Sequence, residues 1–168
     1  SPRILSRYRY QQVESELSGY TDSDWAGCKR TAKSTSGGAI MCGGHTLKSW
    51  SSTQKSITLS SGEAELVAVV KMSCELIGMI QLIKDWGMVK YGRVWVDSSA
   101  ALGIIKRKGN GKMRHVRVGQ LWVQQAQEEG ELSYEKIGGT DNPSDLMTKH
   151  LATNDMWRHM TKLRQVPT

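Results

Sequence analysis

The sequence predicts a single α/β domain built on a mixed β-sheet. Its 168 residues are enough for one sizeable hydrophobic core. Short β-type segments separated by turns come first, and a long helical segment followed by alternating strand and helix signals comes next. Hydrophobic residues make up 38% of the chain and charged residues 23%, which is typical of a globular domain.

Composition also argues against several classes of protein. No apolar run reaches the ~18 residues of a membrane span, and no charged-then-apolar signal segment opens the chain. Because the chain starts without Met, we interpret it as a processed product or an excised fragment. The three cysteines include no Cys-x-x-Cys pair, which argues against a disulfide framework or a structural zinc site and for a reducing compartment. The net charge of +7 favours a polyanionic partner.

The amino-terminal part is expected to form an antiparallel meander after a polar, basic linker over residues 1–18. Gly27 and the Gly43-Gly44 pair mark turns between its strands. These strands are predicted at residues 19–22, 36–41 and 46–52.

The remaining elements alternate between helix and strand. Gly87 is a stop signal for the longest helix, and Pro143 suits the first turn of a later one. We expect helices over residues 62–86, 98–106, 121–129 and from 143, strands over 93–97 and 132–137, and a helical tail over 151–168.

Glu65 is the most informative candidate site residue. At ~100° per residue it falls on the apolar side of the long helix, where a carboxylate is costly unless it is paired or bound to a cation. Glu63 has a simpler interpretation, because Ser60 and Glu63 have the spacing of a capping box. For Glu65 the alternative is a first-turn acid that complements the helix dipole, and periodicity alone does not separate the two.

Asp97 follows an apolar strand and precedes a Ser98 helix cap. Ligands gather at the carboxyl ends of strands in open α/β sheets, but a turn-forming Asp is the alternative. Asp22 and Asp24 lie in or just after the first strand and project to one side if the strand continues, so spacing does not distinguish them.

Asp145 is expected near the start of the last core helix, where an acid also complements the helix N-terminus without any further function. If Asp145 and the other acids met in space, their mutual repulsion would favour a divalent cation, and hard oxygen ligands suit Mg²⁺ or Mn²⁺. Two such ions can activate water at a phosphodiester.

The segment from Lys106 to Arg117 carries six basic residues and no acid, so it would contact phosphates, or else be a solvated turn. The residues alone therefore indicate a metal-dependent enzyme acting on nucleic acid.

Six blocks of the sequence resemble the ribonuclease H domain of copia-type LTR retrotransposon polyproteins, in the family's order over about residues 19–150. They are Gly-Tyr-Thr-Asp-Ser-Asp-Trp-Ala-Gly (19–27), Lys-Ser-Thr-Ser-Gly-Gly (33–38), Lys-Ser-Trp-Ser-Ser-Thr-Gln-Lys (48–55), Leu-Ser-Ser-Gly-Glu-Ala-Glu-Leu-Val-Ala (59–68), Val-Asp-Ser-Ser-Ala-Ala (96–101) and Asn-Pro-Ser-Asp-Leu-Met-Thr-Lys (142–149).

The resemblance implies a five-stranded mixed sheet in the order 3-2-1-4-5 with helices on its faces. It implies an endoribonuclease that cuts the RNA strand of RNA–DNA hybrids during reverse transcription, using two Mg²⁺ ions, with Mn²⁺ as a substitute. It selects Asp22 over Asp24 and Glu65 over Glu63, and it makes Asp22, Glu65, Asp97 and Asp145 the catalytic metal ligands. Asp22 would bridge the two ions, and Asp145 would hold the ion beside the attacking water.

The resemblance further implies three segments: a linker over residues 1–18 from a reverse transcriptase domain, a ribonuclease H domain over 19–150 and a helical tail over 151–168. The isolated domain is expected to be monomeric, with no membrane partner. Its expected location is the cytoplasm, inside retrotransposon particles, with the nucleus as the alternative.

Hydroxyl and basic side chains are the expected contacts to the hybrid, through sugar-phosphate groups that carry no base code. The loop over residues 138–140 lacks the His that cellular relatives carry before the last Asp. A non-catalytic module that binds nucleic acid or packs on a polymerase is the main alternative, and a related two-metal DNA nuclease or integrase-like domain is another. The expected nucleic-acid contacts are Ser34, Thr35, Ser61, Lys106, Arg107, Lys108, Lys112, Arg114 and His115.

Overall fold

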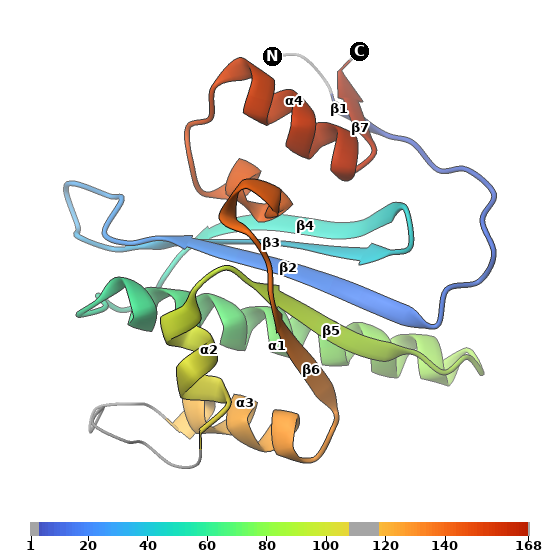
Figure 1. The fold of residues 1–168 in the computed structure, drawn as a ribbon, viewed down its shortest axis with the longest axis horizontal. Helices are drawn as coiled ribbons and strands as arrows, with labels where there is room; N and C mark the ends of the chain where they lie inside the picture. Colours follow the sequence, from blue (N-terminus) through green and yellow to red (C-terminus); the bar gives the residue numbers. More distant parts are fainter. Residues whose placement is uncertain (1–3, 108–117, 168) are drawn as a thin grey trace.

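The computed structural model describes residues 4–107 and 118–167, which fold around a five-stranded mixed sheet (Figure 1). The strand order is β4-β3-β2-β5-β6. β2, β3 and β4 form an antiparallel meander, and β5 and β6 continue the sheet as strands parallel to β2. This confirms the predicted fold class and strand order. The bounds are β2 (Glu16–Asp24), β3 (Thr35–Cys42), β4 (His45–Thr53), β5 (Tyr91–Val96) and β6 (Leu132–Lys136).

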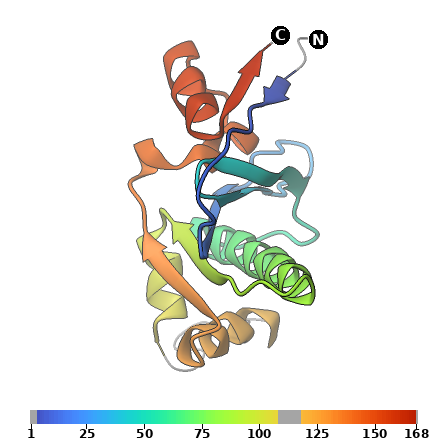
Figure 2. The ribbon, with the colours of Figure 1, turned by 90° about the vertical axis from the view of Figure 1, so that its right-hand side faces the viewer.

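Helices cover both faces of the sheet. α1 (Ser61–Asp85) runs along one face, and α2 (Ser99–Ile105) and α3 (Val118–Glu128) pack beside it. The other face carries the 3₁₀ turns η1 (Gly139–Asp141) and η2 (Pro143–Met147), and above them α4 (Thr153–Lys162) (Figure 2). The molecule therefore has three layers, with the sheet in the middle.

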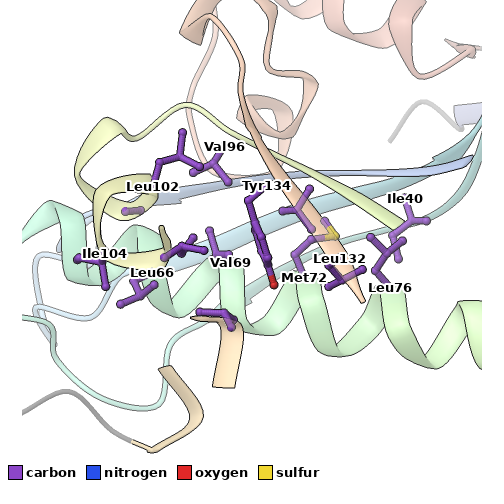
Figure 3. Close-up of a cluster of buried hydrophobic side chains, with 14 of the residues drawn as sticks. Ile40, Leu66, Val69, Met72, Leu76, Val96, Leu102, Ile104, Leu132 and Tyr134 are labelled. Carbon is purple, nitrogen blue, oxygen red and sulfur yellow. The ribbon is translucent and has the colours of Figure 1, made fainter. Parts of the chain in front are cut away.

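The core lies between α1 and the sheet (Figure 3). Leu66, Val69, Met72 and Leu76 recur every three or four residues along α1 and are fully buried. α1 is also apolar and long enough, by length and composition alone, to cross a membrane. In this fold its apolar side packs on the sheet, as a core helix does.

The two ends of the described chain lie side by side (Figure 2). β1 (Ile4–Ser6) pairs antiparallel with β7 (Gln165–Pro167) to form a separate two-stranded sheet. The segment that follows β1 is attached to the main sheet, because the Tyr8 hydroxyl donates to the Thr46 carbonyl at 2.8 Å.

The last core element differs from the prediction. An α-helix was expected from residue 143, but residues 143–147 form only the short 3₁₀ turn η2. Asn142 caps this turn and Pro143 opens it, as the sequence indicates. A turn of five residues is too short to be stabilised as an independent α-helix, so its shape is set by packing against β3.

Candidate metal centre

Three carboxylates from three elements meet at one edge of the sheet. Asp22 comes from β2, Glu65 from α1 and Asp97 from the residue after β5. One oxygen of each lies within 4.8 Å of the others. β2 and β5 are parallel neighbours, with Thr21 opposite Val96, so both strands deliver their acids to the same end of the sheet.

The start of α1 explains why Glu65 and not Glu63 faces this cluster. The Ser60 hydroxyl accepts the backbone N–H of Glu63 at 3.2 Å, and Glu63 accepts the N–H of Leu59 at 2.7 Å. Glu63 is therefore used to cap the helix. Glu65 lies two residues further along, is only 9% exposed and points toward the end of β2.

Asp22 and Asp24 also have different surroundings. Asp22 is 1% exposed and belongs to the cluster, whereas Asp24 is partly exposed and accepts the backbone N–H of Thr35. Asp24 thus supports the turn between β2 and β3. Of these two aspartates, the structure brings Asp22 and not Asp24 to the other two clustered carboxylates.

Burial and mutual repulsion dominate the electrostatics of the cluster. Burial, followed by the charges of Asp22 and Asp97, raises the pKa of Glu65 to about 8. Burial and the Asp22 charge also raise the pKa of Asp97. One Glu65 oxygen accepts the Ser23 N–H at 3.2 Å, but the other is buried without a hydrogen-bond partner. A buried acceptor in this state is costly and is suited to a cation.

Asp145 is near the cluster but is connected to it through a lysine. The Lys149 ammonium lies 2.9 Å from Asp145 Oδ1 and 3.1 Å from Asp22 Oδ1. Asp145 is 9% exposed, and burial is the main cause of its raised pKa. The structure therefore places three of the four predicted ligands together, and it links the fourth to Asp22 by ion pairs.

Contacts on both sides fix η2 at this position. The Asn142 amide donates to the Thr21 carbonyl at 2.9 Å, and the Ser51 hydroxyl donates to the Met147 carbonyl at 2.6 Å. The Thr148 hydroxyl donates to the second oxygen of Asp22. β3 admits this close approach because Gly37 has no side chain: a Cβ there would lie 2.7 Å from the Met147 Cβ.

The donor set fits a hard divalent cation. All three clustered groups offer carboxylate oxygens, which Mg²⁺ and Mn²⁺ prefer, and the unpartnered Glu65 oxygen is available. Asp22, Glu65 and Asp97 could hold one ion, and Asp22 with Asp145 could hold a second.

The expected nucleic-acid contacts have different exposures. Thr35 is partly exposed and Ser61 is exposed, near the ends of β2 and α1 that carry the cluster. Ser34 is fully buried, and its hydroxyl accepts the Ala26 N–H at 3.0 Å, so it has no surface to offer a substrate.

Basic residues follow the cluster along α2. This helix begins two residues after Asp97 and is about 10 Å long at 1.5 Å per residue, and Lys106 and Arg107 follow its last residue. Lys106 is exposed. Lys108, Lys112, Arg114 and His115 lie outside the described residues.

Three residues of the site carried no predicted role. Asn142, Thr148 and Lys149 belong to the last of the six sequence blocks, but no function was attached to them. The i,i+4 spacing of Asp145 and Lys149 is a signal for a local ion pair. No sequence signal indicates the contact of Lys149 with Asp22, because these residues are 127 positions apart.

Comparison with known proteins relates the chain to transposon polyproteins. The chain is 30% identical over 140 residues, 82% of its length, to the retrovirus-related Pol polyprotein from transposon TNT 1-94 of Nicotiana tabacum. It is 27% identical over 151 residues, 88% of its length, to that from transposon RE1 of Arabidopsis thaliana. The chain spans about a tenth of the length of these relatives. No protein-family model matches the sequence.

Solved structures share the fold. LC11-RNase H1, isolated from compost by a metagenomic approach, superposes with a TM-score of 0.63 at 18% identity, covering 80% of this chain and 93% of that protein. This chain is a ribonuclease H-fold domain related to transposon Pol polyproteins. A structure of LC11-RNase H1 in complex with RNA/DNA hybrid also matches the ribonuclease H-fold domain, with a TM-score of 0.54 at 19% identity, over 79% of this chain and 93% of that one.

Proposed function

We propose that this domain hydrolyses the RNA strand of RNA–DNA hybrids with the help of two divalent ions, as one module of a retrotransposon polyprotein. One observation carries the proposal: three carboxylates from distant parts of the chain lie within 4.8 Å, and one of them has a buried oxygen without a partner. Folding brings like charges together here at a cost, and a bound cation would offset it. Ribonuclease H-fold and Pol relatives support the same activity.

The residues of the cluster would act by holding and orienting the ions. Asp22 belongs to the cluster with Glu65 and Asp97, and it shares the Lys149 ammonium with Asp145, so it is the group suited to bridge two ions. When bound, two Mg²⁺ or Mn²⁺ ions would activate a water and stabilise the leaving oxygen of the phosphodiester. Glu65 lies in the second turn of α1, and Asp97 follows the end of β5. Because both come from regular elements, they would fix the position of the ion that they share with Asp22.

An RNA–DNA hybrid is the proposed substrate. LC11-RNase H1, which shares the fold, has been solved in complex with RNA/DNA hybrid. We expect Lys106 and Arg107, which follow α2, to contact phosphates, and such contacts position a duplex without reading its sequence. We therefore expect cleavage that is largely independent of sequence.

The proposed partner within the polyprotein is a reverse transcriptase domain connected through residues 1–18. Residues 19–150 would be the catalytic segment and 151–168 a carboxyl-terminal tail, which contains the strand β7 after α4 and is therefore not helical throughout as predicted. The proposed location is the cytoplasm, within retrotransposon particles, or the nucleus.

Cleavage of labelled hybrid tests the proposal directly. The domain is incubated with hybrid labelled on either strand, in Mg²⁺ and in EDTA, beside Asp97→Asn. We expect Mg²⁺-dependent cleavage of the RNA strand alone, and a loss of at least about 10²-fold in Asp97→Asn, because a neutral amide is a poor ligand for a divalent ion. Asp85→Asn is the matched control, because Asp85 is exposed at the far end of α1.

The result also separates the alternatives. If the parent protein binds hybrid without cutting it, and a longer protein that includes the polymerase domain is also inactive, the domain is a binding module. If DNA strands are cut with equal rate, the two-metal nuclease alternative is correct and the hybrid substrate is wrong.

A further inference from the structure

Lys149 bridges two of the proposed metal ligands. Its ammonium is 3.1 Å from Asp22 Oδ1 and 2.9 Å from Asp145 Oδ1. Asp22 is 1% exposed and Asp145 is 9% exposed, whereas the Lys149 side chain is 42% exposed. A partly exposed cation is thus held between two buried anions.

The backbone of the turn positions the Lys149 ammonium between the two aspartates. The Lys149 N–H donates to the Asp145 carbonyl at 2.9 Å, so the two side chains leave the same side of the turn. Contacts of Asn142 with Thr21 and of Ser51 with Met147 hold the turn against the sheet. The ammonium therefore reaches Asp22 without any rearrangement of the backbone.

The two halves of the site are not equivalent. In the cluster of Asp22, Glu65 and Asp97, a Glu65 oxygen is buried and unpartnered, so that half is open to a cation. Between Asp22 and Asp145, each aspartate already has a positively charged partner. One half is ready to bind an ion, and the other is occupied by the protein's own charge.

We propose that the Lys149 ammonium occupies the second divalent-ion position in the metal-free protein, and that it must leave before an ion can bind between Asp22 and Asp145. This inference rests on the proposed function and specifies how the site is loaded. It makes Lys149 a competitor for a metal position, not a metal ligand.

The sizes and bonding needs of the two cations support mutual exclusion. Mg²⁺ requires oxygens at 2.0–2.1 Å in nearly octahedral geometry. An ion bound by both aspartates would lie between them, where the ammonium lies now. The lysine ammonium is a compact point charge on a flexible stem, and water can solvate it outside the site. An ion would bind first at the cluster of Asp22, Glu65 and Asp97. A second ion would bind between Asp22 and Asp145 only after the Lys149 side chain had rotated out toward solvent.

Mn²⁺ titration monitored by electron paramagnetic resonance tests this inference without measuring cleavage. It reports the number of bound ions and the affinity of each position. We expect wild-type protein to bind one ion more tightly than a second. Lys149→Met should strengthen the second position by roughly 10- to 100-fold, the range in which residues around a site alter metal affinity, and leave the first within about threefold. Lys149→Arg, which keeps the charge and can bind carboxylates bidentately, should weaken the second position further.

Two controls make the outcome specific. Lys162→Met removes a lysine that pairs with Asp141 at 2.8 Å outside the cluster, and it should change neither position. In an Asp145→Asn background the second position should be lost, and Lys149→Met should then have no effect on the remaining ion.

The possible failures are distinguishable. If two ions bind and Lys149→Met leaves the second affinity unchanged or weakens it, the inference is wrong while the metal site of the proposed function stands. If no variant binds Mn²⁺, the proposed function fails, and this inference fails with it. Metal-free melting curves of each variant verify that it is folded.

Discussion

Glu65 shows how much chemistry depends on one buried side chain. Its carboxyl group is nearly enclosed, has one unpartnered oxygen and faces the charges of Asp22 and Asp97. With a pKa of about 8, it is largely protonated in the metal-free protein at neutral pH. A divalent ion would have to displace this proton, so metal binding should release protons and strengthen as the pH rises.

The same group makes metal-free stability depend on pH. The folded pKa of about 8 is above the ordinary value of 4.5, so the folded state holds a proton that the unfolded state loses. The stabilising contribution is complete below about pH 4.5 and is lost as the pH rises through 8. We expect the free energy of unfolding in EDTA to fall by a few kcal/mol over this window, since one pKa unit is worth about 1.4 kcal/mol.

Urea unfolding at pH 5 and pH 9 measures this effect, with Glu65→Gln as the comparison. The neutral amide has no proton to lose, so most of the pH dependence should disappear in the variant. A decline of equal size in Glu65→Gln would show that another group causes it. Asp97 and Asp145, whose pKa values are also raised, would then be the groups to test.

The position of η2 depends on a residue of β3 that has no side chain. Gly37 pairs with Asp22 in the sheet, and a Cβ on Gly37 would lie 2.7 Å from both the Met147 Cβ and the Thr148 Cγ2. Contacts this short force η2 to move away from β3. The geometry of Asp145 and Lys149 relative to Asp22 therefore depends on a glycine in the adjacent strand.

We expect Gly37→Ala to separate activity from folding. It should destabilise the protein by about 1–3 kcal/mol, as overpacking usually does, and reduce hybrid cleavage by at least about tenfold because the aspartates shift. Gly78→Ala is the matched control: nothing lies within 4 Å of its added Cβ on α1, so it should stabilise by up to about 1 kcal/mol and keep activity. Thermal melting measures the stability of each variant, and the cleavage assay measures its activity. Full activity in Gly37→Ala would contradict the proposal that activity depends on the position of η2.

The structure is most predictable from the sequence where a pattern is local. The apolar side of α1, its Ser60 cap and the inward position of Glu65 all follow from residues within a few turns of one helix. η2 was predicted as a helix from Asn142 and Pro143, but the packing that limits it to a short 3₁₀ turn comes from β3, over a hundred residues earlier. Periodicity contains no information about such a contact.

For the whole molecule, the sheet order and the choice of Asp22 over Asp24 came from the resemblance and not from residue patterns. Spacing alone left Asp22 and Asp24 equivalent; burial in the folded sheet separates them. Lys149 was missed for the same reason, because its contact with Asp22 exists only after β2 and η2 are packed together.

The net charge of +7 should appear as salt-dependent binding to hybrid. Replacing Lys106 and Arg107 by Gln is expected to weaken affinity for all sequences alike and to reduce the slope of log affinity against log salt by about one per lost phosphate contact. Lys84 is exposed at the end of α1 that is farther from the carboxylate cluster. Lys84→Gln should therefore leave the slope unchanged. Fluorescence anisotropy across a salt series measures this; identical slopes for all three proteins would exclude α2 as a phosphate contact.

The small sheet of β1 and β7 has a consequence for engineering. Since Leu5 lies opposite Val166, a short Gly-Ser bridge could join the two ends, and fresh termini could be opened at the exposed Gly87 turn. Such a circular permutant should keep the carboxylate cluster intact, because neither cut nor splice touches the strand ends that build it.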